Sequence, residues 1–312
     1  MVGAEFGSFF LADPGAFPEA VKGSTWGHHQ RLMKLPGGPF LITGLNASQV
    51  ELMDREYSTV ITETPPFDDE IHKTVVFREV PEFFREFDMR GWTYTHDIES
   101  TAKLIKLAGL NFTALVPRTT GETAGLWTSV EDDWFQGVIE NYLRAMVAHR
   151  LVFCDGVLLH SAGAVIDGSA YLFVGASGAG KSTLARKALE SGSPVLSDDL
   201  NAVEDLSVKP KVAQLPFTGE LRDLDTFDGA APLRGIFLLN KGDAVICESL
   251  SRAQAVAAIM ATSPYVNHGT DNLDSLMESL AILTAQVPVA RLVSAKTSTF
   301  EEIKIAIQRF QE

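Results

Sequence analysis

Cysteine and positive charge are both scarce in this sequence of 312 residues. The 2 cysteines, Cys154 and Cys247, are too few for a disulfide framework and lack the spacing of a metal site. Lys and Arg number 26 against 40 Asp and Glu, which gives a net charge of −14. Such a field repels polyphosphate backbones and anionic lipid headgroups. We therefore expect neither nucleic acid nor a membrane surface as a partner.

No apolar stretch is long enough to cross a membrane. The runs 157–166 and 171–174 are separated by Asp167 and Gly168, and each is too short to span a bilayer. The first 23 residues contain acidic side chains and lack the basic region and the apolar core of a signal peptide. We therefore expect a cytoplasmic protein whose thiols are reduced.

The first part of the chain has the pattern of strands. Residues 1–128 combine short β-rich runs, at 39–43, 74–77 and 113–117, with turn clusters of proline and glycine. One helix is expected within this part, at residues 99–108. The pattern predicts a β-rich N-terminal region, which is a candidate for substrate recognition.

From residue 129 onward, predicted strands and helices alternate, which indicates an α/β or mixed α+β domain over residues 129–312. Thr128 and Glu131 have the spacing of a capping box ahead of a helix. An apolar stripe follows and is expected to be core: Trp134, Val138, Ile139, Tyr142, Leu143, Met146 and Val147. Two further capping boxes predict helices near the C-terminus: Ser251 with Gln254, and Ser298 with Glu301.

The most specific motif is a glycine-rich loop between a predicted strand and a predicted helix. It comprises Gly175, Ala176, Ser177, Gly178, Ala179, Gly180, Lys181, Ser182 and Thr183. Backbone N–H groups and the helix dipole would converge on phosphates there, with Lys181 at the β- and γ-phosphates and the Ser182 hydroxyl on Mg²⁺. The motif predicts a nucleoside triphosphate ligand, with ATP as donor and Mg²⁺ as cofactor. The alternative is a glycine-rich turn with a solvated lysine.

Two carboxylates follow the next predicted strand. Asp198 and Asp199 come directly after the short run 195–197. One of them can hold Mg²⁺ while the other takes a proton from an attacking hydroxyl, and the pattern leaves open which is the base. A surface turn is the alternative, because strand ends often carry aspartate.

His160 is the third candidate. The runs on either side of Asp167 and Gly168 form a predicted two-residue hairpin, and its register sets His160 opposite Gly175. The imidazole would then border the phosphate loop. A packed or solvated histidine is the alternative, and no such register supports His28, His29 or His268.

In this order and spacing, His160, the 175–182 loop and the Asp198-Asp199 pair resemble HPr kinase/phosphorylase. The nucleotide domain of that family is similar to that of phosphoenolpyruvate carboxykinase. The resemblance implies a P-loop domain of this type, in which His160 and Lys181 are active-site residues and Ser182 binds Mg²⁺. It also implies Asp199 as general base with Asp198 as its helper.

The resemblance extends to a possible third metal ligand. The family has a Glu-Ile-Arg-Gly stretch that contributes a metal-binding glutamate, and Glu220-Leu-Arg-Asp stands at a similar distance here. This implies Glu220 as a metal residue, with Arg222 beside it, while a solvated loop is the alternative. The sequence looks more like the divergent HPr-kinase-like proteins, among which are kinases that act on serine in peptides, and this membership does not fix a substrate.

These observations favour an ATP-dependent kinase. Its acceptor would be a hydroxyl, either on Ser or Thr of a protein or peptide or on a small metabolite. The alternative is a nucleotide-dependent switch with slow hydrolysis. A carboxykinase is disfavoured, because no basic cluster and no His/Lys metal pair is evident. The sequence leaves the oligomeric state open, including a homo-oligomer.

Overall fold

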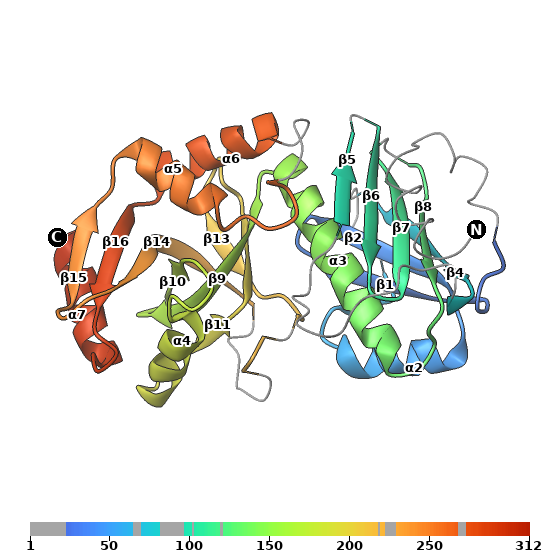
Figure 1. The fold of residues 1–312 in the computed structure, drawn as a ribbon, viewed down its shortest axis with the longest axis horizontal. Helices are drawn as coiled ribbons and strands as arrows, with labels where there is room; N and C mark the ends of the chain where they lie inside the picture. Colours follow the sequence, from blue (N-terminus) through green and yellow to red (C-terminus); the bar gives the residue numbers. More distant parts are fainter. Residues whose placement is uncertain are drawn as a thin grey trace. The chain divides into compact units, whose positions relative to one another are not determined.

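The computed structural model describes residues 23–64, 70–81, 97–101, 103–118, 121–217, 219–221, 229–267 and 273–312. The fold is mixed α/β with two large sheets, each of 8 strands (Figure 1). The chain divides into two compact units, residues 1–146 with 268–271 and residues 147–267 with 272–312. The sequence-based boundary is at residue 128, whereas this division lies inside a helix, between Met146 and Val147.

The first unit is built on a mixed sheet with the strand order β3-β1-β2-β4-β8-β7-β6-β5. Its elements are β1 (His29–Leu35), β2 (Gly38–Leu45), α2 (Ala47–Glu56), β3 (Ile61–Thr62), β4 (His72–Arg78), β5 (Asp97–Ser100), β6 (Leu104–Gly109), β7 (Phe112–Pro117), β8 (Ala124–Thr128) and most of α3 (Trp134–Phe153). The three predicted β-rich runs lie in β2, β4 and β7, which confirms the β-rich character of this part.

The prediction of a helix at residues 99–108 is wrong. Residues 104–109 form β6, which pairs antiparallel with β5 and β7. The short apolar run has no periodicity that separates a buried strand from a helix, and pairing on both sides decides for the strand.

The start of α3 also differs from its sequence-based prediction. Thr128 is the last residue of β8, and the carboxylate of Glu131 accepts a hydrogen bond from Asn46 instead of capping the helix. The backbone N–H of Trp134, where α3 begins, is capped by Asp132. Trp134 itself is 64% exposed, so its assignment to the core is wrong, whereas the other six residues of the stripe are buried.

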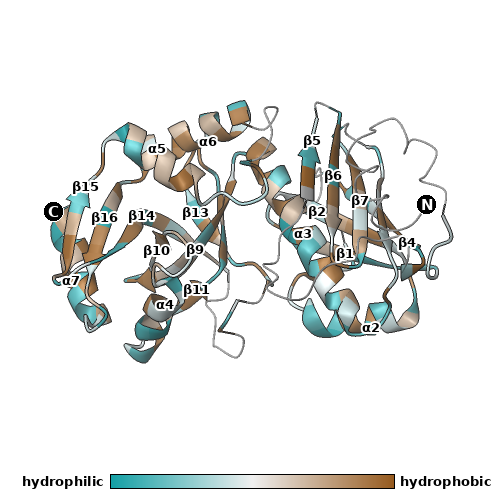
Figure 2. Cartoon of the chain, viewed as in Figure 1, coloured by the Kyte–Doolittle hydropathy of each residue, from teal (hydrophilic) through white to brown (hydrophobic). Residues whose placement is uncertain are grey.

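The second unit is built on a sheet with the order β10-β9-β12-β13-β14-β16-β15, with β11 paired to β9. Its strands are β9 (Val157–Ile166), β10 (Ser169–Val174), β11 (Val195–Ser197), β12 (Leu200–Glu204), β13 (Lys211–Ala213), β14 (Ala230–Lys241), β15 (Ile246–Ser249) and β16 (Val289–Ser294). Because β10 also pairs with β14, the strands β9, β12, β13, β14 and β10 close into a ring of pairings. Figure 2 shows that β9, β10 and β14 are among the most apolar strands of the chain.

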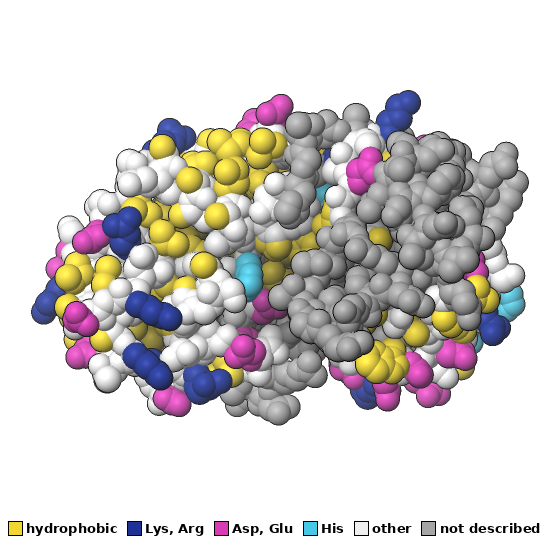
Figure 3. Space-filling model, in the orientation of Figure 1, with side chains coloured by type: hydrophobic (Ala, Val, Ile, Leu, Met, Phe, Trp, Pro, Cys, Tyr) yellow, Lys and Arg dark blue, Asp and Glu magenta, His cyan; other side chains and the backbone are white. Residues whose placement is uncertain are grey.

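Four helices accompany this sheet: α4 (Lys181–Glu190), α5 (Arg252–Met260), α6 (Leu273–Gln286) and α7 (Phe300–Gln311). The helices α4 and α7 pack beside one another in one apolar cluster with β9, β10, β14 and β16. The helices α5 and α6 contact each other, and α6 lies against β9. On the face in Figure 3, basic and acidic side chains of this unit are interspersed.

The predicted hairpin is confirmed, and so is one of the three predicted capping boxes. Asp167 and Gly168 have φ of 50° and 76°, which are the positive angles of a type I′ turn, and they join β9 to β10 in the predicted register. Ser251 with Gln254 forms the capping box of α5. The box of α7 is instead Thr299 with Glu302, one residue later than expected.

Candidate functional site

The glycine-rich loop connects β10 to α4 and exposes its backbone. Gly178 and Gly180 have φ of 74° and 111°, angles that only glycine adopts without strain. The N–H of Ala179 bonds to the carbonyl of Ala176, which closes a turn within the loop. The side of the loop that holds Ala176, Ser177 and Gly178 is exposed. Two of the glycines are therefore required by backbone conformation.

The first turn of α4 has no side-chain cap. Gly180 is its N-cap residue, and the first bond of the helix runs from the N–H of Leu184 to the carbonyl of Gly180. The N–H groups of Lys181, Ser182 and Thr183 consequently have no acceptor within the helix. Ser182 is half-buried and Thr183 is exposed. An uncapped helix start of this kind favours an anion at its N-terminal end.

Lys181 is buried and folded back onto the loop. Its Nζ donates to the carbonyl oxygens of Gly175 at 2.9 Å and Ala176 at 3.4 Å. Burial lowers the pKa of Lys181, and the negative charge of Asp199 partly opposes this shift.

The aspartate pair lies in the turn between β11 and β12. The Oγ of Ser197 accepts from the N–H groups of Asp199 and Leu200, which fixes the turn. Asp198 is buried, with only 5% exposed, and among the described residues its Oδ2 has no hydrogen-bond partner. A surface turn does not bury a carboxylate in this way, so this feature needs an explanation.

Gly219 contacts the pair directly. A Cβ at this position would lie 2.0 Å from Oδ1 of Asp198 and 3.2 Å from Cβ of Asp199. Only a residue without a side chain fits against the carboxylate. The sequence signal for this contact is the glycine immediately before Glu220.

His160 contacts Asp199. The Nε2 of His160 lies 3.4 Å from Oδ1 of Asp199, with side chains 46% and 27% exposed. The predicted pairing of His160 with Gly175 does not form, because the β9–β10 ladder ends at Ser161 and Val174. His160 pairs with Leu200 of β12 instead, and its N–H donates to the carbonyl of Thr262. The histidine therefore borders the aspartate turn.

Of the remaining predicted residues, the structure describes Glu220 only. Glu220 is exposed and follows Gly219, so its backbone is next to a residue that contacts Asp198. Arg222 and His268 lie outside the described residues. Within the described ranges, no group of three or more His, Cys, Asp and Glu side chains is arranged to hold a metal ion.

The profile of one protein family matches this chain. The family is described as "SynChlorMet cassette protein ScmC", and the match covers residues 132–303, which is more than half of the sequence. The chain belongs to the ScmC family. This name differs from that of the HPr kinase family, which the sequence motifs resemble. The matched segment includes the glycine loop, the aspartate pair and His160.

Other comparisons are weaker. No curated protein matches the chain. Among solved structures, the chain is similar to the Hpr(Ser) kinase/phosphatase from Coxiella burnetii, with 13% sequence identity and a TM-score of 0.30. The alignment covers 49% of this chain and 95% of that chain. Values of this size do not establish a common fold. In the part of this ScmC-family chain that is described, no helix combines the length and hydropathy needed to span a membrane.

Asn201 is a further residue of the site that the sequence analysis missed. It is 1% exposed and donates to the carbonyl oxygen and the Oγ of Ser161, at 2.7 and 3.0 Å. Gly163 allows this close approach, because a Cβ there would lie 2.5 Å from Oδ1 of Asn201. Asn201 thus ties β12 to β9 just beside Asp199 and His160.

Proposed function

We propose that this ScmC-family protein is a phosphotransferase that moves the terminal phosphoryl group of a nucleoside triphosphate to a hydroxyl. The acceptor is Ser or Thr of a protein or peptide, or a small hydroxylated molecule. The acceptor oxygen bonds to the γ-phosphorus while the bond from that phosphorus to the β,γ-bridging oxygen breaks. The hydroxyl proton passes to a carboxylate, and a nucleoside diphosphate leaves.

The glycine loop supports binding of the phosphates. The uncapped N–H groups at residues 181–183 and the exposed turn at residues 176–178 present donors to an anion. Among the described residues, Lys181 has no carboxylate within bonding distance and donates only to carbonyls of its own loop. An ammonium held by neutral acceptors can transfer to phosphate oxygens with a net electrostatic gain. The donor that the sequence predicts is ATP, and these contacts are common to all nucleoside triphosphates.

The residues fit a divalent cation. The buried Oδ2 of Asp198 lacks a partner, and a carboxylate oxygen in this state is stabilised by a cation. Asp198 and Ser182 would hold Mg²⁺, with Glu220 as a further ligand. Mg²⁺ is commonly held by one or two carboxylates together with phosphate oxygens and water, and when bound it neutralises charge on the β- and γ-phosphates.

Asp199 is the better candidate for the base. It is more exposed than Asp198, and the imidazole of His160 lies beside it. A base must reach the acceptor from solvent, which the buried Asp198 does less well. His160 would position the Asp199 carboxylate toward the hydroxyl.

The observation that carries the proposal is the partnerless oxygen of Asp198 beside the Asp199–His160 pair. A buried carboxylate without a partner lowers the stability of the fold, and such destabilising groups are typical of ligand sites.

The proposal is tested with the full chain, γ-labelled ATP and GTP, and fractionated host lysate as the source of acceptor. Label should appear in an acceptor identified by mass. Asp199→Asn should lower transfer by roughly 10²- to 10⁴-fold and leave nucleotide binding in place. Glu190→Gln, an exposed carboxylate at the end of α4, is the matched control and should transfer at the original rate.

Two results would contradict the proposal. If Asp199→Asn transfers phosphate at the original rate, Asp199 is not the base. Release of inorganic phosphate without any labelled acceptor, unaffected by Asp199→Asn, would favour the alternative of a nucleotide-dependent switch.

A further inference from the structure

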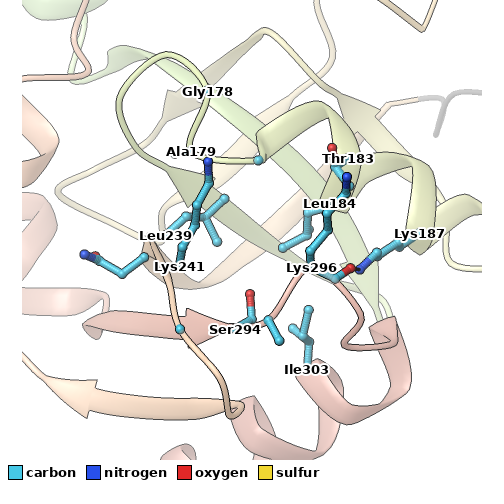
Figure 4. Close-up of a pocket in the computed structure, with 14 residues that line it drawn as sticks. Gly178, Ala179, Thr183, Leu184, Lys187, Leu239, Lys241, Ser294, Lys296 and Ile303 are labelled. Carbon is cyan, nitrogen blue, oxygen red and sulfur yellow. Dashed lines mark hydrogen bonds between the residues drawn. The ribbon is translucent and has the colours of Figure 1, made fainter.

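A pocket of about 380 Å³ adjoins the glycine loop on the side of β14 and β16 (Figure 4). Its walls come from the loop at residues 178–180, the first turns of α4, the end of β14 and the turn after β16. Side chains of Leu184, Leu239 and Ile303 make its apolar part. The size and the mixture of apolar surface with a few polar groups are those of a small-molecule site.

The position of the pocket follows from the parallel strands. The strands β10, β14 and β16 run parallel and in this order, so their carboxyl ends meet at one edge. The glycine loop follows the first of them, and the second ends with Asn240 and Lys241, which Gly242 follows. The third strand ends at Ser294, and Ala295 and Lys296 follow it. In α/β sheets, ligands bind outside the carboxyl ends of parallel strands.

Both turns at this edge are fixed by hydrogen bonds. The N–H of Gly242 bonds to the carbonyl of Ser294, and a Cβ at residue 242 would lie 2.3 Å from Cγ1 of Val293. The Nζ of Lys187 donates to the carbonyls of Lys296 and Ser298, which holds the second turn. A ligand would therefore meet a preformed site, with little further ordering of the chain.

Two lysines of the pocket remain available. Figure 4 shows the side chains of Lys241 and Lys296 extending from the strand ends toward the glycine loop and the start of α4. Neither ammonium has a hydrogen bond or an ion pair among the described residues. Their methylene stems can cover a flat ring while the ammonium groups lie near phosphate.

A carboxylate, Asp243, follows one of the two segments that line the pocket. Asp243 follows Gly242, is exposed, and has no partner among the described residues. Gly242 lines the pocket and is held against the end of β16, and Asp243 is the next residue of the chain. The two segments at this edge thus contribute two cationic side chains, Lys241 and Lys296, and one acceptor-only group, Asp243.

We propose that this pocket holds the base and ribose of the donor and that the base is guanine, an inference that rests on the phosphate site proposed above. Guanine presents two neighbouring donors, N1–H and the 2-amino group, which a carboxylate accepts together. Adenine has an acceptor at N1 and no 2-amino group, so Asp243 would face a lone pair. Discrimination by a bidentate base contact amounts to about tenfold or more.

The experiment measures binding of inorganic triphosphate, GTP, ATP and XTP with Mg²⁺ to the full chain by calorimetry. GTP should bind at least about tenfold tighter than ATP. In xanthine an oxygen acceptor replaces the 2-amino donor of guanine, so Asp243→Asn, whose amide donates, should weaken GTP and strengthen XTP, each by about tenfold. A gain in XTP affinity requires a folded variant, so it distinguishes the loss of one contact to guanine from misfolding.

The lysines are tested in parallel. Lys241→Met and Lys296→Met keep the stems and remove the charge, and should weaken GTP more than inorganic triphosphate. Lys209→Met, at an exposed lysine outside the pocket, is the control and should change neither.

The two proposals fail in different ways. Suppose that Lys181→Met abolishes binding of all four ligands. If the native chain then binds ATP as tightly as GTP, or if Asp243→Asn does not weaken GTP binding and strengthen XTP binding, the guanine assignment is overturned and the phosphate site stands. If none of the four ligands binds, or if Lys181→Met binds them as tightly as the native chain does, both proposals are overturned.

Discussion

Gly219 gives the sharpest test of the candidate site, because a single methyl group would collide with Asp198. The added Cβ of Gly219→Ala would lie 2.0 Å from Oδ1 of Asp198, where about 3.4 Å is an ordinary contact. The carboxylate or the backbone at residue 219 must therefore move by more than 1 Å. A misplacement of about 1 Å in a catalytic arrangement costs roughly 10²-fold in rate.

The assay tests the proposed role of Asp198 as a ligand of Mg²⁺. Turnover by Gly219→Ala should fall by about 10²-fold, and the Mg²⁺ concentration for half-maximal rate should rise. Gly137→Ala is the control, because nothing lies within 4 Å of a Cβ at that exposed helical position. The control should keep full activity and should be slightly more stable, since alanine favours a helix.

Two results would contradict the assignment of Asp198 as a metal ligand. If Gly219→Ala keeps its turnover and its Mg²⁺ dependence, then the Asp198 carboxylate does not hold the metal. A lowered melting temperature without any change in Mg²⁺ dependence would assign the contact to packing alone.

Three further predictions concern neighbouring residues. Lys181→Met should abolish most of the stabilisation by nucleotide, which at 100 times the dissociation constant is about 2.7 kcal/mol; thermal melting with and without ligand measures this, and an equal shift in the variant would reject the site. His160→Gln should lower turnover by about tenfold and change nucleotide affinity only a few-fold; lost stability with intact specific activity would mean a packing role. Asn201→Ala should lower the free energy of unfolding by roughly 1 to 3 kcal/mol, because Ser161 loses its buried donor. Denaturant unfolding beside the surface variant Asn141→Ala checks this value, and equal stabilities would contradict it.

Local chemistry allowed much of the second unit to be predicted from sequence. A type I′ turn needs positive φ at two residues, and Asp167-Gly168 supplies them, so the β9–β10 hairpin and its register follow. The glycine loop and α4 follow from Gly178, Gly180 and the apolar spacing of Leu184, Ala185 and Ala188. These features depend on contacts between residues that are near in sequence.

Predictions failed where distant partners decide. The strand β6 was predicted as part of a helix, because its apolar run fits both periods and only pairing with β5 and β7 separates them. Trp134 fits the apolar stripe of α3, yet it lies in the first turn, where the structure leaves it exposed. The spacing of Thr128 and Glu131 fits a capping box, but β8 uses the first residue and Asn46 binds the second.

The sequence alone therefore determined which residues could carry the chemistry: the glycine loop with Lys181, the aspartate pair and His160. Tertiary structure decided how they differ. It buried Asp198 against Gly219, left Asp199 accessible beside His160, and brought the ends of β14 and β16 to the loop as a pocket. Burial and contact of this kind depend on strands and turns far apart in the chain, which no local sequence pattern encodes.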